Sequence, residues 1–129
     1  MCSSDLLARA RVEQWMDWQA TELNPAWRHA FMHRVRRHPD FADEAAAERS
    51  AAAWGRCLQI LENHLAQSGS YVTGEAPTLA DLVLALSTHR WLATPMADDE
   101  RPALPLVRAH HHRLSERPAW AAAGCGHHP

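Results

Sequence analysis

The stretch GEAPTLADLVLAL, from Gly74 to Leu86, combines a turn, a helix cap and an apolar run in one short segment. Pro77 fixes its backbone angle just before Thr78, a residue type that commonly caps the start of a helix. Asp81, three residues later, can accept a hydrogen bond from a free backbone N–H of that first turn, as in a capping box. The apolar residues that follow lie at helical spacing: Leu79, Leu82, Val83 and Leu86. The segment predicts a helix that begins at Thr78.

Apolar residues at helical spacing predict two long helices before this one. The first runs from about Ser4 to Arg36, and Pro25 should kink or interrupt it. The second begins near Asp40 or Asp43. Its apolar stripe consists of Trp54, Leu58, Leu61 and Leu65.

Two helices are expected after the segment at Thr78. One follows Pro102 and has on one face Val107, His110 or His111, and Leu114. A short last helix is opened by Pro118 and stopped by Gly124. The segment YVTG is too short to form a sheet. The sequence therefore predicts an all-α helical bundle of four main helices plus a short C-terminal helix.

The length and composition of the chain limit its organisation and partners. We expect one domain over residues 1–129, with a core over about 5–123. A net charge of −2 gives no electrostatic reason to expect nucleic acid or a membrane surface as partner. We expect no signal peptide, and no apolar run reaches the roughly 18 residues that a membrane span needs. With three cysteines in no metal-type spacing, we expect a cytoplasmic protein.

Clustered histidines raise the question of a metal site. His110, His111 and His112 are consecutive, and His127 and His128 lie near the C-terminus. Neighbouring residues on a helix point about 100° apart, so the triplet cannot converge on one ion. We expect these histidines to be structural or on the surface, and we expect no metal site.

Taken together, these segments resemble the C-terminal domain of cytosolic glutathione S-transferases over residues 5–123. The resemblance rests on the order of a tyrosine, a glycine and a Thr-x-Ala-Asp turn, followed by an Arg-Pro-Ala before a short helix. The opening ARARVEQWMDWQATELNPAW also looks like the long first helix of bacterial members. The residues that carry the resemblance are Tyr71, Gly74, Thr78, Ala80, Asp81, Arg117, Pro118 and Ala119.

The resemblance implies a structural role for Thr78 and Asp81 as the cap of the central core helix, rather than a catalytic one. Members of the family usually carry a bulky apolar residue just before the capping threonine. This chain has Pro77 there, opposite Leu82, and a proline ring can still make the apolar contact.

The resemblance also implies a function that this chain does not complete. In the family, a preceding thioredoxin-like domain holds the group that activates the thiol of glutathione, the cosubstrate. We expect no catalytic residue here and leave open whether the chain is an enzyme. Expected partners are a hydrophobic electrophile and either a second copy, as a homodimer, or a thioredoxin-like domain.

By the same resemblance, this domain supplies a wall of the electrophile site. The residues expected to bind the electrophile are Trp18, Thr21, Glu22, Pro25, Trp27 and His89. The alternative for the tryptophans is packing in the core or against the absent domain. Two other functions are open: a stand-alone helical module for protein–protein interaction, and a bundle that binds a small apolar ligand through its tryptophans.

Overall fold

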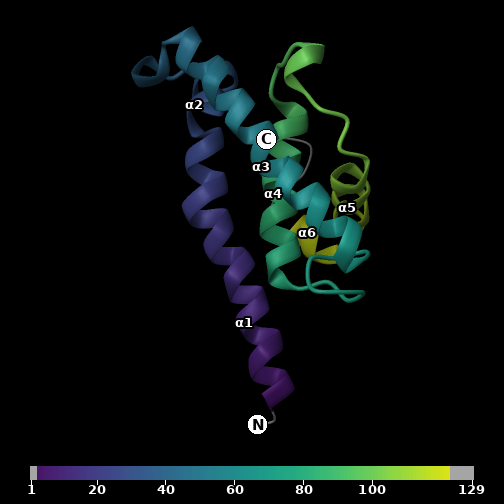
Figure 1. Ribbon diagram of the computed structural model, residues 1–129. Helices are drawn as coiled ribbons and strands as arrows, with labels where there is room; N and C mark the ends of the chain where they lie inside the picture. Colours follow the sequence, from purple (N-terminus) through teal and green to yellow (C-terminus); the bar gives the residue numbers. More distant parts are fainter. Residues whose placement is uncertain (1–2, 123–129) are drawn as a thin grey trace.

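A long helical segment opens the chain in the computed structural model, which describes residues 3–122 (Figure 1). Helix α1 (Ser3–Trp18), the π-helical turn η1 (Gln19–Leu23) and α2 (Asn24–Arg34) follow one another without a break. Pro25 lacks an N–H, and its ring would clash with the carbonyl four residues back in a regular α-helix. The wider turn just before it relieves this clash, with the Asn24 N–H bonded to the Gln19 carbonyl. The interruption expected at Pro25 is therefore a π turn.

The second long helix begins directly after Asp43, one of the two acidic residues near which its start is expected. After the 3-10 turn η2 (Pro39–Phe41), α3 spans Glu44–Ser68. Asp43 precedes α3, and its Oδ1 accepts hydrogen bonds from the N–H groups of Ala45 and Ala46 at 3.0 and 3.3 Å. These bonds satisfy donors of the first turn that have no partner inside the helix.

The remaining elements are α4 (Leu79–Ala93), the 3-10 turn η3 (Asp98–Glu100), α5 (Pro105–Ser115) and α6 (Pro118–Ala122). Helix α5 follows Pro102, as expected, and begins directly after Leu104, which takes a left-handed conformation with φ 44°. The expected end of the last helix at Gly124 lies outside the described residues. The all-α prediction is confirmed, and none of the helices over residues 3–122 is long and apolar enough to cross a membrane.

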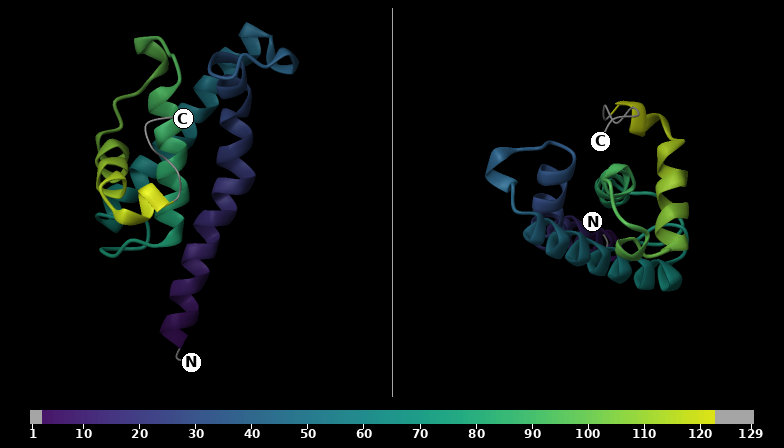
Figure 2. Two further views of the ribbon diagram at one scale, coloured as in Figure 1. Left: turned by 180° about the vertical axis from the view of Figure 1, so that it is seen from behind. Right: turned by 90° about the horizontal axis from the view of Figure 1, so that it is seen from above.

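Helix α4 forms the centre of the bundle. Seen along its axis in Figure 2, α4 is surrounded by the other helices, whereas the first turns of α1 extend beyond the rest. Its buried residues share the main core with those of α3 and the start of α5. The largest fully buried side chains of this core are Trp54, Trp91, Leu23, Leu58, Leu61 and Leu84.

A fully buried carboxylate connects the start of α4 to two other segments. Asp81 Oδ2 accepts hydrogen bonds from the Thr78 N–H at 2.8 Å and from the Thr78 hydroxyl at 3.2 Å. Its Oδ1 accepts from the Val72 N–H and from His110 Nε2, both at 2.9 Å. Burial by itself would raise the pKa of Asp81, but the bonds from His110, Val72 and Thr78 outweigh it and lower that pKa. The carboxylate thus joins α4 to the preceding loop and to α5.

A second buried carboxylate fixes the start of α5. Glu62 lies on α3, and its two oxygens accept from the Leu106 N–H at 3.0 Å each, while Oε1 also accepts from the Val107 N–H at 3.0 Å. These N–H groups belong to the first turn of α5, where a negative charge is favourable. Helix α5 therefore takes its N-terminal partner from another helix.

We expect Asp81→Ala to lower the free energy of unfolding by about 3–5 kcal/mol, because it leaves buried donors on three segments without their partner. Urea unfolding at pH 7 measures the change. Asp99→Ala, which removes an exposed carboxylate, is the matched control and should change stability by less than about 0.5 kcal/mol. Equal stabilities of the two variants would contradict the assigned role of Asp81.

Candidate functional site

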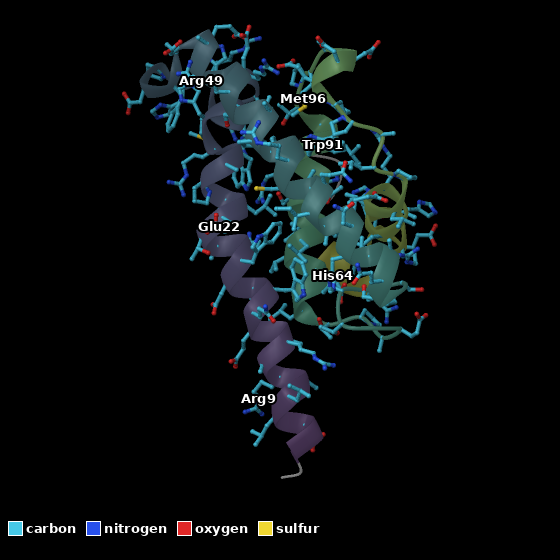
Figure 3. All side chains as sticks on the ribbon, viewed as in Figure 1. Arg9, Glu22, Arg49, His64, Trp91 and Met96 are labelled. Carbon is cyan, nitrogen blue, oxygen red and sulfur yellow. The ribbon has the colours of Figure 1, made fainter. Side chains whose placement is uncertain are left out.

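An aromatic surface lies on the long N-terminal helix, on the side that faces the bundle. The half-buried rings of Trp15 and Trp18 meet edge to face, with centroids 5.3 Å apart. Trp15 also packs against His64 of α3 at 4.5 Å, and His64 Nε2 bonds to the Val72 carbonyl. Figure 3 labels His64 on α3 and Glu22 on the long helix. Trp18 thus belongs to a half-exposed apolar wall made by α1.

Three more of the expected residues follow Trp18 on the same helical segment. Thr21, Glu22 and Pro25 are exposed. The Thr21 hydroxyl donates to the Asp17 carbonyl at 2.8 Å, so its proton is used within the helix. Glu22 is the residue of this group whose polar side chain has the most freedom to meet a ligand.

Trp27 is held by more contacts than the other expected residues. Its indole N–H donates to Asn24 Oδ1 at 2.8 Å, and its ring lies near Trp54, with centroids 5.8 Å apart. Phe31 meets it edge to face at 5.4 Å, and the Arg90 guanidinium lies 5.3 Å from its centroid. Trp27 therefore packs between α2, α3 and α4, as the alternative for the tryptophans expects.

His89 lies on a different side of α4. Its neighbour Arg90 reaches Trp27, whereas His89 contacts His111 of α5 and Trp120 of α6. The structure brings Trp18, Thr21, Glu22 and Pro25 onto one helical segment, but it does not bring His89 to that segment.

The three consecutive histidines of α5 have three different environments. His110 is fully buried on Asp81, and His112 is exposed and pairs with Glu116 at 2.9 Å. His111 lies against His89 and Trp120. Burial and the neighbouring histidines lower the pKa of His111 to about 4, so its imidazole is neutral at pH 7. Among residues 3–122, no group of three or more His, Cys, Asp and Glu side chains could hold a metal ion.

Several pockets lie away from the α1 wall, a polar one and an apolar one among them. A polar pocket of about 350 Å³ is lined in part by Arg34 and Met96, at the end of the bundle remote from the N-terminus (Figure 3). Arg34 binds both oxygens of Glu100 at 3.0 Å, which lowers the pKa of Glu100. Arg34 also donates to the Pro95 carbonyl, so its guanidinium is largely used in structural bonds.

The second pocket is an apolar groove of about 340 Å³ at the start of α4. It is lined by Pro77, Leu79 and Leu82 of this segment and by Leu114 and Ala119 from the C-terminal helices. Leu79 is 55% exposed. Pro77 and Leu82 thus face the same groove, as a contact across the cap requires.

Sequence reasoning missed Glu62 and the His89–His111 contact. Glu62 lies on the same buried face of α3 as Leu58 and Leu61. An acidic side chain on a buried face requires hydrogen-bond donors from another segment, and this was the available signal. The pairing of His89 with His111 has no such signal, because it depends on how α4 and α5 pack.

Comparison with known proteins agrees with this fold. The family profile described as glutathione S-transferase, C-terminal domain, matches residues 44–113. The theta class glutathione S-transferase from Xanthomonas axonopodis pv. citri, solved with glutathione bound, superposes with a TM-score of 0.78 at 29% identity. That superposition covers 90% of this chain and 59% of the other. The chain belongs to the family of glutathione S-transferase C-terminal domains.

Two curated relatives show how the domain occurs in longer proteins. Human glutathione S-transferase theta-1 is 37% identical over 83 residues, which are 61% of this chain and 34% of the relative. Elongation factor 1-gamma 2 from Arabidopsis thaliana is 30% identical over 117 residues, 91% of this chain and 28% of the relative. The chain thus spans about a third or less of the length of these two proteins.

The pKa of His111 predicts a loss of stability on acidification. Between pH 6.5, its usual pKa, and about 4, the unfolded chain binds a proton that the folded chain does not. The free energy of unfolding should therefore fall as the pH is lowered through this window, by about 3 kcal/mol in total. The contribution of Asp81, whose pKa is lowered, is lost only below its usual 3.8.

Urea unfolding at several pH values between 7 and 4 measures this dependence. His111→Gln is the matched variant, and its stability should vary less with pH across the same window. An equal pH dependence in both proteins would show that His111 does not carry the effect.

Proposed function

We propose that this chain is the electrophile-site and dimerisation domain of a glutathione S-transferase that conjugates glutathione to hydrophobic electrophiles in the cytoplasm. The match of the family profile to residues 44–113 is the observation that carries this proposal. The glutathione bound in the Xanthomonas relative supports the same thiol as cosubstrate here. Detoxification of such electrophiles is the role that follows.

The aromatic wall of α1 supports an apolar substrate. Trp15 and Trp18 offer half-exposed aromatic surface, and Glu22 follows one turn later with an exposed carboxylate. Apolar walls with a few polar groups are typical of sites for small molecules. In this proposal Trp18 contacts the electrophile, with Thr21, Glu22 and Pro25 at the rim, whereas Trp27 and His89 act through packing.

The chain alone is proposed to lack conjugating activity. Conjugation requires glutathione to be held as a thiolate, which needs a hydroxyl, thiol or helix N-terminus directed at its sulfur. A thioredoxin-like domain, within a longer protein or as a partner chain, would supply that group. The exposed apolar groove around Leu79 and Leu82 is a surface that such a domain could cover.

We expect the purified chain to show no glutathione-dependent conjugation of a chlorodinitrobenzene above the uncatalysed rate. In the source cell, the intact mass should exceed 14.5 kDa by roughly one thioredoxin-like domain. An active full-length transferase assayed in parallel is the control. Conjugation by the purified chain alone would overturn the proposal.

Tryptophan fluorescence tests whether the aromatic wall of α1 binds the electrophile. An apolar electrophile analogue, such as a dinitrophenyl thioether, should quench the fluorescence saturably, and Trp18→Ala should weaken its binding by at least about tenfold, or about 1.4 kcal/mol. Trp120→Phe, on the other side of α4, is the matched control and should bind as the unchanged chain does. Equal affinities in all three proteins would exclude Trp18 from the site.

The elongation factor relatives favour a second candidate function. The Arabidopsis protein, which matches 91% of this chain, is named an elongation factor and not a transferase, so the second candidate is a stand-alone module for protein–protein interaction. An intact mass of 14.5 kDa in the source cell, together with a monomeric chain that unfolds in one cooperative transition, would favour this function over the transferase.

A further inference from the structure

Two histidines from different helices face each other beside Trp120. His89 Nδ1 of α4 lies 3.3 Å from His111 Nε2 of α5. The ring planes differ by 19°, and the ring centroids are 5.5 Å apart. Because the centroids are much farther apart than the nitrogens, the rings meet end to end, with nitrogen directed toward nitrogen.

Hydrogen bonding leaves this pair poorly satisfied. The separation of 3.3 Å is longer than the roughly 2.9–3.0 Å of a good N–H hydrogen bond. The other nitrogen of His89, Nε2, is buried and has no hydrogen-bond partner. The ring of Trp120 is nearly perpendicular to both imidazoles, with centroids 5.4 Å away from each. Two facing nitrogen ligands therefore stand against an aromatic wall with only a weak bond between them.

We propose that His89 Nδ1 and His111 Nε2 bind one soft monovalent cation of the Cu(I) or Ag(I) type between them. A metal–imidazole bond is about 2 Å long, so the two nitrogens would stand about 4 Å apart. They are 3.3 Å apart, and a small movement of the two side chains makes up the difference. The end-to-end arrangement suits linear coordination, which these ions accept, and imidazole is a suitable ligand for copper.

A divalent ion fits this place less well. Zn²⁺ prefers four ligands, and residues 3–122 offer no third His, Cys, Asp or Glu to complete such a group. Asp81, the carboxylate bonded to the neighbouring His110, is already used by that bond. Placing a doubly charged ion beside an apolar surface, with no carboxylate to balance its charge, also costs desolvation free energy. The proposal uses only one member of the histidine triplet, so the three still do not converge on one ion.

The experiment uses the full chain in a background that lacks its thiols and its two C-terminal histidines. Thiols and terminal imidazoles bind the same cations, so the background carries the substitutions Cys2→Ser, Cys57→Ser, Cys125→Ser, His127→Asn and His128→Asn. Ag⁺ is titrated calorimetrically in chloride-free buffer at pH 7.5, and Cu(I) is measured by competition with bicinchoninate. We expect one equivalent of either cation to bind, and no binding would overturn the proposal.

Single variants in this background identify the ligands. His89→Asn and His111→Asn should each lower the affinity by more than about 100-fold, since even the outer partners of metal ligands cost roughly 10–100-fold. His112→Asn, exposed on the same helix, is the matched control and should bind unchanged. Circular dichroism checks that each variant is folded, and either histidine variant alone suffices. Equal binding by all variants, or Zn²⁺ binding as tight as Ag⁺, would overturn the proposal.

Discussion

The carboxylate of Asp81 is the contact on which the arrangement of the central helix depends. It is fully buried, and its donors come from Thr78 at the start of α4, from Val72 in the preceding loop and from His110 of α5. A buried charge of this kind is stable only when it is fully hydrogen-bonded. Because its partners lie on three segments, the start of α4, the loop before it and α5 must be in place together. The Thr-x-x-Asp spacing therefore serves both as a local cap and as a tertiary connection.

Hydrogen bonds to a buried carboxylate also fix the first turn of α5. Glu62 of α3 bonds to the N–H groups of Leu106 and Val107, so α5 is held by a carboxylate at its first turn and by His110 in its middle. Leu104 enters this helix with a positive φ, a conformation that costs energy in a non-glycine residue. The bonds from Glu62 help to offset that cost. Acidic residues on buried faces thus position helices that the apolar core alone would leave free to slide.

Local patterns predicted a large part of this structure. The helix start at Thr78, the cap at Asp43 and the break near Pro25 each follow from the chemistry of a few neighbouring residues. The form of the break was not predictable, because a π turn and a kink both relieve the proline clash. A helix was expected after Pro102, and α5 begins at Pro105, but the left-handed conformation of Leu104 was not predicted. Of the candidate site, α1 carries the polar and aromatic residues expected there, but the contacts of Trp27 and His89 depend on packing between helices.

The histidine triplet shows how one helical repeat separates three roles. Consecutive residues point about 100° apart, so His110 turns inward to Asp81, His111 turns to His89, and His112 turns to solvent and Glu116. The same rotation separates His89 from Arg90 on α4, since Arg90 reaches Trp27 beside the α1 side of the bundle. The aromatic wall of α1 and the imidazole pair therefore lie on different sides of one central helix. A substitution at the imidazole pair can leave the α1 wall in place, provided that the bonds of Asp81 to the start of α4, the preceding loop and α5 stay intact.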